Sequence, residues 1–331
     1  MISFVWPAGE PMLAGTGGSE TYTAGHVREL LRRGIAAQVV SVGHGLSDGR
    51  KDFTDIPFLS LTVPEQISDL QGSVVFVNRP YIVPTRNKAA IILHCVTPEG
   101  GGRQVQKDAI VDKTLIATSI YSGQQWALSL DVPYSRMHIV LPFADPVFSN
   151  AKRAKPAKKT RILYAGRLHP DKGIYTLLEM MHEREMQHNG YVVKLVAAGQ
   201  HVEAGRTIAQ MLHGYPYAKL IPAQKTVAAM AQLLAQTDVL LMPSVFAEPF
   251  GMLSVEAQHA GCRVVASNIG GLPETNCGLL TLVEPRNPRA LMTGIAEAVA
   301  LGQATKRERD LAGSEFGLGS SVDRLLRVLR V

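Results

Sequence analysis

A short apolar run that ends in a turn and leads directly into a helix is the feature that most constrains the fold. Residues 239–256 read VLLMPSVFAEPFGMLSVE. The run Val239–Met242 contains no polar residue and stops at Pro243-Ser244, which favours a strand buried on both faces. Pro249 suits the first turn of the following helix, and Gly261 suits its C-terminal cap. A doubly buried strand followed by a helix is typical of a parallel α/β sheet.

Two carboxylates lie on this stretch. Glu248 follows the strand's carboxyl end, and Glu256 lies about two turns into the helix, on the same side as the loop. Ligands of open parallel sheets bind at this edge. Phe250-Gly251 opens the helix, so its free N–H groups can bind acceptors while the carboxylates accept from hydroxyls. A polyhydroxylated ligand with an anionic part fits, and two solvated carboxylates are the alternative.

The same alternation recurs along all 331 residues, a length that suggests two domains of ordinary size. Apolar strands are predicted at 2–6, 37–42, 74–78, 89–93, 161–168, 194–198, 218–222, 239–242 and 264–267. Helices are predicted at 21–33, 174–186, 226–236 and 322–330. The pattern predicts an α/β protein.

Two cations follow the strand that opens the second half. Arg167 and Lys172 lie on a loop that enters the helix at Ile174, where backbone N–H groups favour a phosphate. Arginine offers a fork to phosphate oxygens and lysine acts as a point charge, so the pair suits a diphosphate. A pair of surface cations is the alternative.

A glycine-rich loop follows the first strand. Gly15 and Gly17 do not make a dinucleotide fingerprint, because the third position is Glu20. Gly17-Gly18 before a helix instead permits close approach of backbone to a phosphate or a sugar, with a flexible loop as the alternative. His94 ends the strand AAIIL and precedes a second glycine-rich loop, Gly100–Gly102. A lone histidine is either a structural residue or a ligand contact.

The net charge of +6 comes from one region. Residues 1–150 hold 12 Lys and Arg against 13 Asp and Glu, so the excess lies in the rest. Much of it is one run, which we interpret as a solvated linker, with contact to anionic lipid or to a nucleotide as the alternatives: Lys152, Arg153, Lys155, Lys158, Lys159 and Arg161. No nucleic-acid-binding motif occurs. There is no membrane-length apolar run and no signal peptide, and three scattered cysteines do not form a disulfide framework, so we expect a cytoplasmic protein.

Several motifs together resemble the retaining GT-B glycosyltransferases of family 4, the glycosyl transferases group 1. They are Glu-x7-Glu at 248–256, GGLPE at 270–274, Gly-Arg-Leu…Lys-Gly at 166–173 and Gly-Gly-x-Glu at 17–20. The resemblance implies two Rossmann-like α/β domains facing across a cleft. Residues 1–149 would be the acceptor-side domain, residues 150–312 the nucleotide-sugar domain, and residues 313–331 a helix that packs back on the first domain.

The resemblance also implies roles for particular residues. Catalytic roles fall on Glu248 and His94, both near the transferred sugar, and on Arg167 and Lys172 at the donor diphosphate. Donor-binding roles fall on these residues and on the following: Gly17 and Gly18 facing the diphosphate, the Ile221 backbone near the base, Phe250 and Gly251 at the helix start, and Glu256 at the ribose.

The implied activity is hexosyl transfer, with retention, from a nucleoside diphosphate sugar to a hydroxyl acceptor, with a UDP- or GDP-sugar favoured. No Asp-x-Asp triplet occurs, so we expect a metal-independent enzyme without a cofactor. A two-domain nucleotide- or sugar-binding protein without turnover is the alternative, and a nicotinamide-dependent oxidoreductase is a weaker one. The C-terminal helix is short, so membrane contact is the weaker interpretation of its basic face.

Overall fold

The computed structural model describes residues 1–7, 9–14, 17–87, 89–97, 101–183, 186, 190–197, 202–224 and 226–331. Gly15, Gly100 and the end of the strand expected at 194–198 lie outside these residues. The described chain divides into two compact units. The first comprises Met1–Phe143 and Leu318–Val331, and the second comprises Ala144–Gly317.

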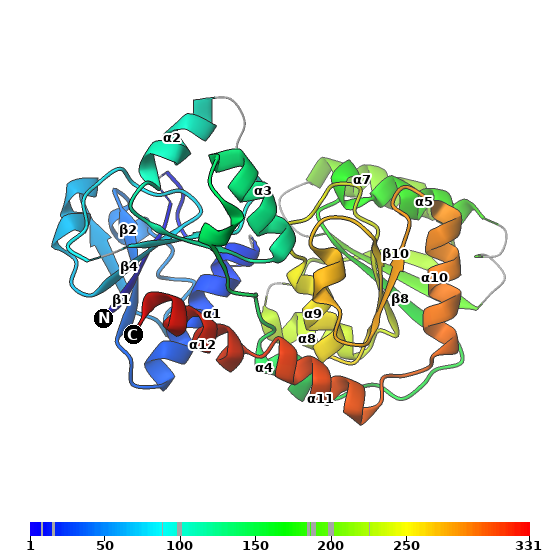
Figure 1. Ribbon diagram of the computed structural model, residues 1–331. Helices are drawn as coiled ribbons and strands as arrows, with labels where there is room; N and C mark the ends of the chain where they lie inside the picture. The colour runs from blue at the N-terminus through cyan, green and yellow to red at the C-terminus, as the bar shows by residue number, and fades with distance from the viewer. Residues whose placement is uncertain are drawn as a thin grey trace. The chain divides into compact units, whose positions relative to one another are not determined.

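The first unit, which contains the strands labelled β1, β2 and β4 in Figure 1, is built on a parallel sheet. Its strand order is β3-β2-β1-β4-β5-β6-β7. Its strands are β1 Ile2–Val5, β2 Ala37–Val42, β3 Phe58–Leu61, β4 Ser73–Val77, β5 Ala90–Leu93, β6 Thr114–Ala117 and β7 Met137–Ile139. Its helices are α1 Gly18–Arg32, α2 Gly101–Ala109, α3 Ile120–Leu130 and α12 Leu318–Leu329. The central strands are buried on both faces, as the sequence predicts for a parallel sheet.

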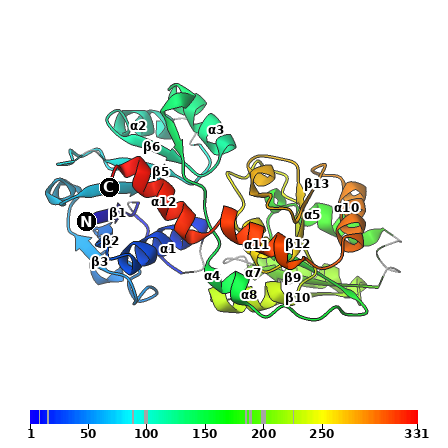
Figure 2. The same ribbon diagram turned by 60° about the horizontal axis from the view of Figure 1, so that its bottom comes forward.

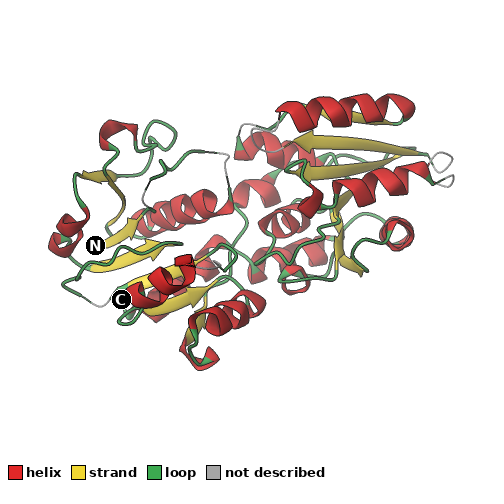
Figure 3. Ribbon diagram, turned by 90° about the horizontal axis from the view of Figure 1, so that it is seen from above, coloured by secondary structure: helices red, strands yellow, loops and turns green. Residues whose placement is uncertain are grey.

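Helices cover both faces of this sheet (Figure 3). Tyr22 and Leu30 of α1 pack in one core with Val322 and Leu325 of α12, and α1 lies beside α12 (Figure 2). Trp126 of α3 packs in the core of the opposite face. The C-terminal helix is therefore part of the first unit.

The second unit repeats the plan with strand order β10-β9-β8-β11-β12-β13, again parallel. Its strands are β8 Thr160–Gly166, β9 Tyr191–Ala197, β10 Ala218–Ile221, β11 Val239–Met242, β12 Arg263–Ser267 and β13 Leu280–Val283. Its helices are α4 Pro146–Asn150, α5 Ile174–His182, α7 Val202–Met211, α8 Val227–Ala235, α9 Met252–His259, α10 Pro288–Ala300 and α11 Lys306–Glu315.

Side-chain caps fix several of these helices. The Thr226 hydroxyl accepts from Ala229 N at 3.1 Å at the start of α8, and Asn287 caps α10 in the same way. Thr305 and Glu308 form a capping box at the start of α11. Each such cap contributes about 1 kcal/mol to helix stability.

Four expected helices differ from the structure by three residues or more at one end. The first begins at Gly18 rather than at residue 21, and the last begins at Leu318 rather than at residue 322. The helix expected at 174–186 ends at His182, because Glu183 is extended. The helix expected to include Pro249 begins at Met252. Gly251 has φ 116°, which no helical residue adopts, so α9 cannot start before it.

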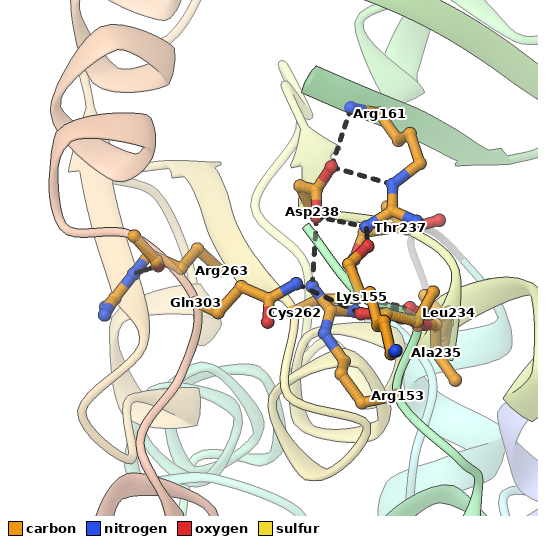
Figure 4. Close-up of polar contacts among 12 residues, drawn as sticks. Arg153, Lys155, Arg161, Leu234, Ala235, Thr237, Asp238, Cys262, Arg263 and Gln303 are labelled. Carbon is orange, nitrogen blue, oxygen red and sulfur yellow. Dashed lines mark hydrogen bonds and ion pairs between the residues drawn. The ribbon is translucent and has the colours of Figure 1, made fainter. Parts of the chain in front are cut away.

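The interpretation of the basic run as solvated is wrong for two of its cations. Arg153 Nη1 donates to the carbonyls of Leu234 at 3.0 Å and Ala235 at 3.3 Å, which lie at the end of α8 (Figure 4). Arg161 forms a fork with Asp238, with Nε–Oδ2 2.9 Å and Nη2–Oδ1 2.7 Å. Arginine suits this role because its donors reach several acceptors at once. These contacts tie the segment before β8 to the second unit.

Candidate active site

The candidate site in the second unit lies at the carboxyl ends of β8 and β11. The two strands are neighbours, but the chain runs from β8 to β9 on one side and reaches β11 on the other. The strand order therefore reverses between them, and in open α/β sheets ligands bind outside such a reversal. The loop after β8 contains Arg167 and Lys172, and the loop after β11 contains Glu248.

Backbone contacts fasten these loops to one another. Val245 N donates to Asp171 O at 2.8 Å. Gly173 has φ 72°, and a Cβ there would lie 1.8 Å from Pro243 O. Gly271 N, in the loop after β12, donates to Glu248 O at 2.7 Å. Glycine alone permits the close approach at Gly173, so the sequence fixes the distance between the two loops there.

Glu248 and Lys172, both predicted site residues, meet in this arrangement. Lys172 Nζ lies 3.0 Å from Glu248 Oε1, and the Ser244 hydroxyl donates to the same oxygen. The side chain of Glu248 is 9% exposed, whereas that of Lys172 is 22% exposed. Lys172 Nζ also lies 4.8 Å from the centroid of the Phe246 ring, a cation–π contact. The carboxylate is thus held by two charge-assisted bonds in a mostly enclosed place.

Arg167 is held differently. The buried Tyr164 donates its hydroxyl to Arg167 O at 2.9 Å and so fixes the backbone of this loop. The Arg167 side chain is exposed. Its guanidinium makes no ion pair with any residue that the structure describes. The site therefore contains one exposed cation and one cation paired with a carboxylate.

The start of α9 presents backbone rather than side chains. The Phe250 ring is 4% exposed and packs on Phe316, with centroids 5.8 Å apart. Gly251 caps the helix, and a Cβ at Gly251 would lie 2.6 Å from the Leu272 side chain. Phe250 and Gly251 can therefore contact a ligand only through main-chain atoms, and the free N–H groups of the first turn of α9 are the donors available there.

Glu256 lies in the second turn of α9, one turn nearer the loop than expected, and is half-buried. Burial, and to a lesser extent the negative charge of Asp145, raises the pKa of its carboxyl to about 7. Asp145 caps α4, accepting from Val147 N at 2.9 Å.

Ile221 ends the edge strand β10 and is half-buried. Beyond it, the Gln224 side-chain amide donates to Pro222 O at 2.8 Å, which shapes the loop that leads to α8. Two strands, β9 and β10, lie on this side of β8. The Ile221 backbone is thus at the same edge of the sheet as Lys172 but further along it.

The first unit has an equivalent edge at β1, β4 and β5. Gly17 is extended and precedes α1, whose first residue is Gly18; as a glycine it has no side chain with which to cap the helix. The neighbouring Ser19 hydroxyl accepts from Asn78 Nδ2 at 3.1 Å. The Asn78 side-chain oxygen in turn accepts from His94 N at 3.0 Å. One amide side chain therefore joins the loop that bears Gly17 and Gly18 to His94.

His94 is half-buried beside an aromatic ring. Tyr22 packs edge-on against it with centroids 4.3 Å apart. Burial, with the nearby His26 adding to it, lowers the pKa of His94 to about 3, so the ring is neutral at pH 7. Its Nε2 is buried and makes no hydrogen bond with a described residue. A neutral imidazole with an unused ring nitrogen can donate to, or accept from, a ligand hydroxyl.

Sequence reasoning missed Ser244, Phe246 and Asn78. Ser244 was read only as a turn residue, and Asn78 only as a strand end. Asn78 has φ 60°, a conformation that asparagine tolerates better than most residues. A polar residue directly after a buried parallel strand is the signal that would have found Ser244 and Asn78.

Comparison with known proteins agrees with this architecture. HepE of Anabaena in complex with UDP superposes with a TM-score of 0.77 at 18% identity over 99% of both chains. A glycosyltransferase of Rickettsia africae superposes with a TM-score of 0.81 at 17% identity, over 99% of this chain and 97% of that one. The chain has the two-sheet α/β fold of GT-B glycosyltransferases.

Sequence comparison gives a more specific match for the second unit. Residues 148–312 match the family model described as Glycosyl transferases group 1, so the chain contains a domain of that family. A D-inositol 3-phosphate glycosyltransferase of Nocardioides sp. is 28% identical over 222 residues, which cover 58% of this chain and 48% of that protein. A lipopolysaccharide 1,2-N-acetylglucosaminetransferase of Salmonella typhimurium is 32% identical over 153 residues, covering 43% and 39%. The matches thus span less than half the length of these relatives.

No helix within the described ranges is long and apolar enough to cross a membrane.

Proposed function

We propose that this chain transfers a hexosyl group, with retention at the anomeric carbon, from a nucleoside diphosphate sugar to a hydroxyl acceptor. The observation that carries the proposal is the placement of Arg167, Lys172 and Glu248 at the strand-order reversal between β8 and β11. Two cations and a fixed carboxylate at one sheet edge suit a ligand with both a diphosphate and sugar hydroxyls.

Diphosphate departure is the demanding step of this chemistry, because negative charge grows on the leaving oxygen while the sugar becomes oxocarbenium-like. Arg167 lies on the loop before α5, and Lys172 lies next to Gly173, which precedes the first residue of that helix. The free N–H groups of the first turn add a partial positive charge at the same place. Groups fixed in this way before the reaction stabilise the developing charge without having to reorganise.

Glu248 is proposed to hold the sugar rather than to attack it. Its Oε1 already bonds Lys172 and Ser244, which leaves Oε2 to accept from a sugar hydroxyl. We expect front-face transfer, in which a phosphate oxygen assists removal of the acceptor proton. Glu256 is proposed to bind the ribose, and the Ile221 backbone to lie near the base. The roles implied for Gly17, Gly18 and His94 remain predictions.

A UDP- or GDP-sugar is the favoured donor, with UDP supported by the complex of HepE with that nucleotide. Metal independence is proposed because Arg167 and Lys172 supply the positive charge that a divalent ion would otherwise provide. Cys95, Cys262 and Cys277 are all free thiols, which supports a reducing cytoplasm as the setting. A two-domain binding protein without turnover is the second candidate, because binding alone would use the same cations.

Turnover separates the two candidates. The protein is incubated with UDP-glucose, UDP-N-acetylglucosamine or GDP-mannose and a panel of hydroxyl acceptors, with and without EDTA. We expect one donor class to release its nucleoside diphosphate, NMR of the product to show the anomeric configuration of the donor, and EDTA to leave the rate unchanged. Binding without release would favour the binding protein. An inverted product, or loss of activity in EDTA that Mn²⁺ restores, would contradict the mechanism.

A further inference from the structure

The positive charge of Lys172 is paired with a carboxylate of the same chain. Its ammonium lies 3.0 Å from Glu248 Oε1 and 4.8 Å from the centre of the Phe246 ring. Arg167, the other cation of the site, is exposed. The two cations therefore differ in what an incoming anion must displace: solvent at Arg167 and a buried carboxylate at Lys172.

The carboxylate is the fixed member of the pair. Ser244 is 2% exposed and donates to the same Oε1. The Glu248 backbone is held by Gly271 N at 2.7 Å, and a Cβ at Gly270 would lie 2.6 Å from Glu248 O. Lysine has a flexible four-carbon stem, whereas this glutamate is held at both ends. If Lys172 exchanges Glu248 for another anion, the Lys172 side chain must therefore be the one that moves.

The pair opposes diphosphate binding unless the carboxylate gains a new partner. An anion that binds the Lys172 ammonium deprives the mostly enclosed Glu248 carboxylate of one of its two partners. An anion that leaves the Lys172–Glu248 pair intact lies near the negative charge of Glu248. A nucleoside diphosphate sugar compensates by offering hydroxyl donors to Glu248. A nucleoside diphosphate lacks the hydroxyls of the transferred sugar, and its ribose is proposed to bind Glu256 instead.

From these contacts we infer that Glu248 is the internal counter-ion that Lys172 exchanges for the donor diphosphate, so that the carboxylate selectively weakens binding of the nucleoside diphosphate product. The inference rests on the proposed function and adds a step to it. Once the sugar has been transferred, Glu248 recovers Lys172 and favours release of the diphosphate.

The test is the affinity of UDP, GDP and ADP for wild type and E248Q, measured by titration calorimetry. Glutamine keeps the shape of the side chain and an oxygen for Ser244 and Lys172, but it removes the charge. We expect E248Q to bind the preferred nucleoside diphosphate about fivefold more tightly or better, since one charge within several ångströms has that effect. Thermal unfolding of both proteins without nucleotide shows whether the variant is folded.

Glu284 provides the matched control. It lies just beyond β13 at the carboxyl edge of the same sheet, is exposed, and bonds Asn287 Nδ2 at 2.7 Å. E284Q removes the same charge without touching Lys172, and we expect its nucleotide affinity to stay within about twofold of wild type. An equal gain in E284Q would overturn the inference, because general charge would then explain the result.

The other outcomes are also decisive. Unchanged affinity in E248Q would mean that Glu248 contacts only the sugar, and weaker binding in a folded variant would mean that it supports the diphosphate site; each would overturn the exchange while leaving the proposed function intact. If neither wild type nor E248Q binds any of the three nucleotides, the proposed function fails and this inference fails with it.

Discussion

At the scale of single residues, the site depends on which groups are held and which are exposed. Glu248 is fixed by Ser244 and Lys172, whereas Arg167 is exposed. Burial keeps the carboxyl of Glu256 partly protonated near pH 7, whereas Glu248 is paired with Lys172. The two glutamates of the Glu-x7-Glu stretch therefore have different electrostatic environments, which their spacing alone does not indicate.

Glu256 gives a prediction about pH. Its pKa is about 7 in the folded protein against 4.5 for the free side chain, so the folded state binds more protons between these values. Its contribution to stability is present below about pH 4.5 and is lost as pH rises through 7. We expect E256Q to remove this dependence, so that its melting temperature relative to wild type rises between pH 5 and pH 8. A constant difference across that range would contradict the shift.

The positions of several candidate site residues were predictable, but their contacts were not. Arg167, Lys172 and Glu248 were expected to lie together because each comes after a buried strand, and parallel strands bring such positions to one edge of the sheet. That Lys172 pairs with Glu248 depends on side-chain positions, which no periodicity encodes. Ser244 and Asn78 were missed because small polar residues at turns are common.

At the scale of elements, the strands were predicted where they are buried on both faces. Val239–Met242 and Ala37–Val42 agree with β11 and β2 to the residue. β3 and β13 were missed because their residues are mostly half-buried, so neither a continuous apolar run nor a clear alternation marks them. α2 was not predicted; it begins with two glycines, which are poor helix formers and were expected to belong to a loop at 100–102.

Gly173 joins two elements of the site and gives a second prediction. G173A would place a Cβ 1.8 Å from Pro243 O at a residue with φ 72°. We expect a loss of more than about 2 kcal/mol in unfolding free energy, from strain and from forced separation of the loops. Chemical denaturation measures it. G190A is the control, because Gly190 has φ 69° but no described atom lies within 4 Å of where its Cβ would be. Equal losses in the two variants would contradict a role for the close approach.

At the scale of the whole chain, the sequence predicted two α/β units, and the structure has two parallel sheets. The first unit comprises the chain up to Phe143 and again from Leu318. The sequence had predicted domain boundaries after residues 149 and 312 instead. The shift arises because α4 packs beside α8 and α9, and Phe316 packs on Phe250. Local sequence patterns do not predict such contacts between segments that are distant in the sequence.

The most direct test of the account is the thermal stabilisation of wild type, R167A and K172A by UDP, GDP, ADP and NAD. We expect one nucleoside diphosphate to raise the melting temperature of wild type, by several degrees at about 100 times its dissociation constant. NAD should have no effect, and both substitutions should abolish the rise. A shift with NAD alone, or an undiminished shift in both variants, would contradict the claim that the reversal between β8 and β11 is a nucleoside diphosphate site.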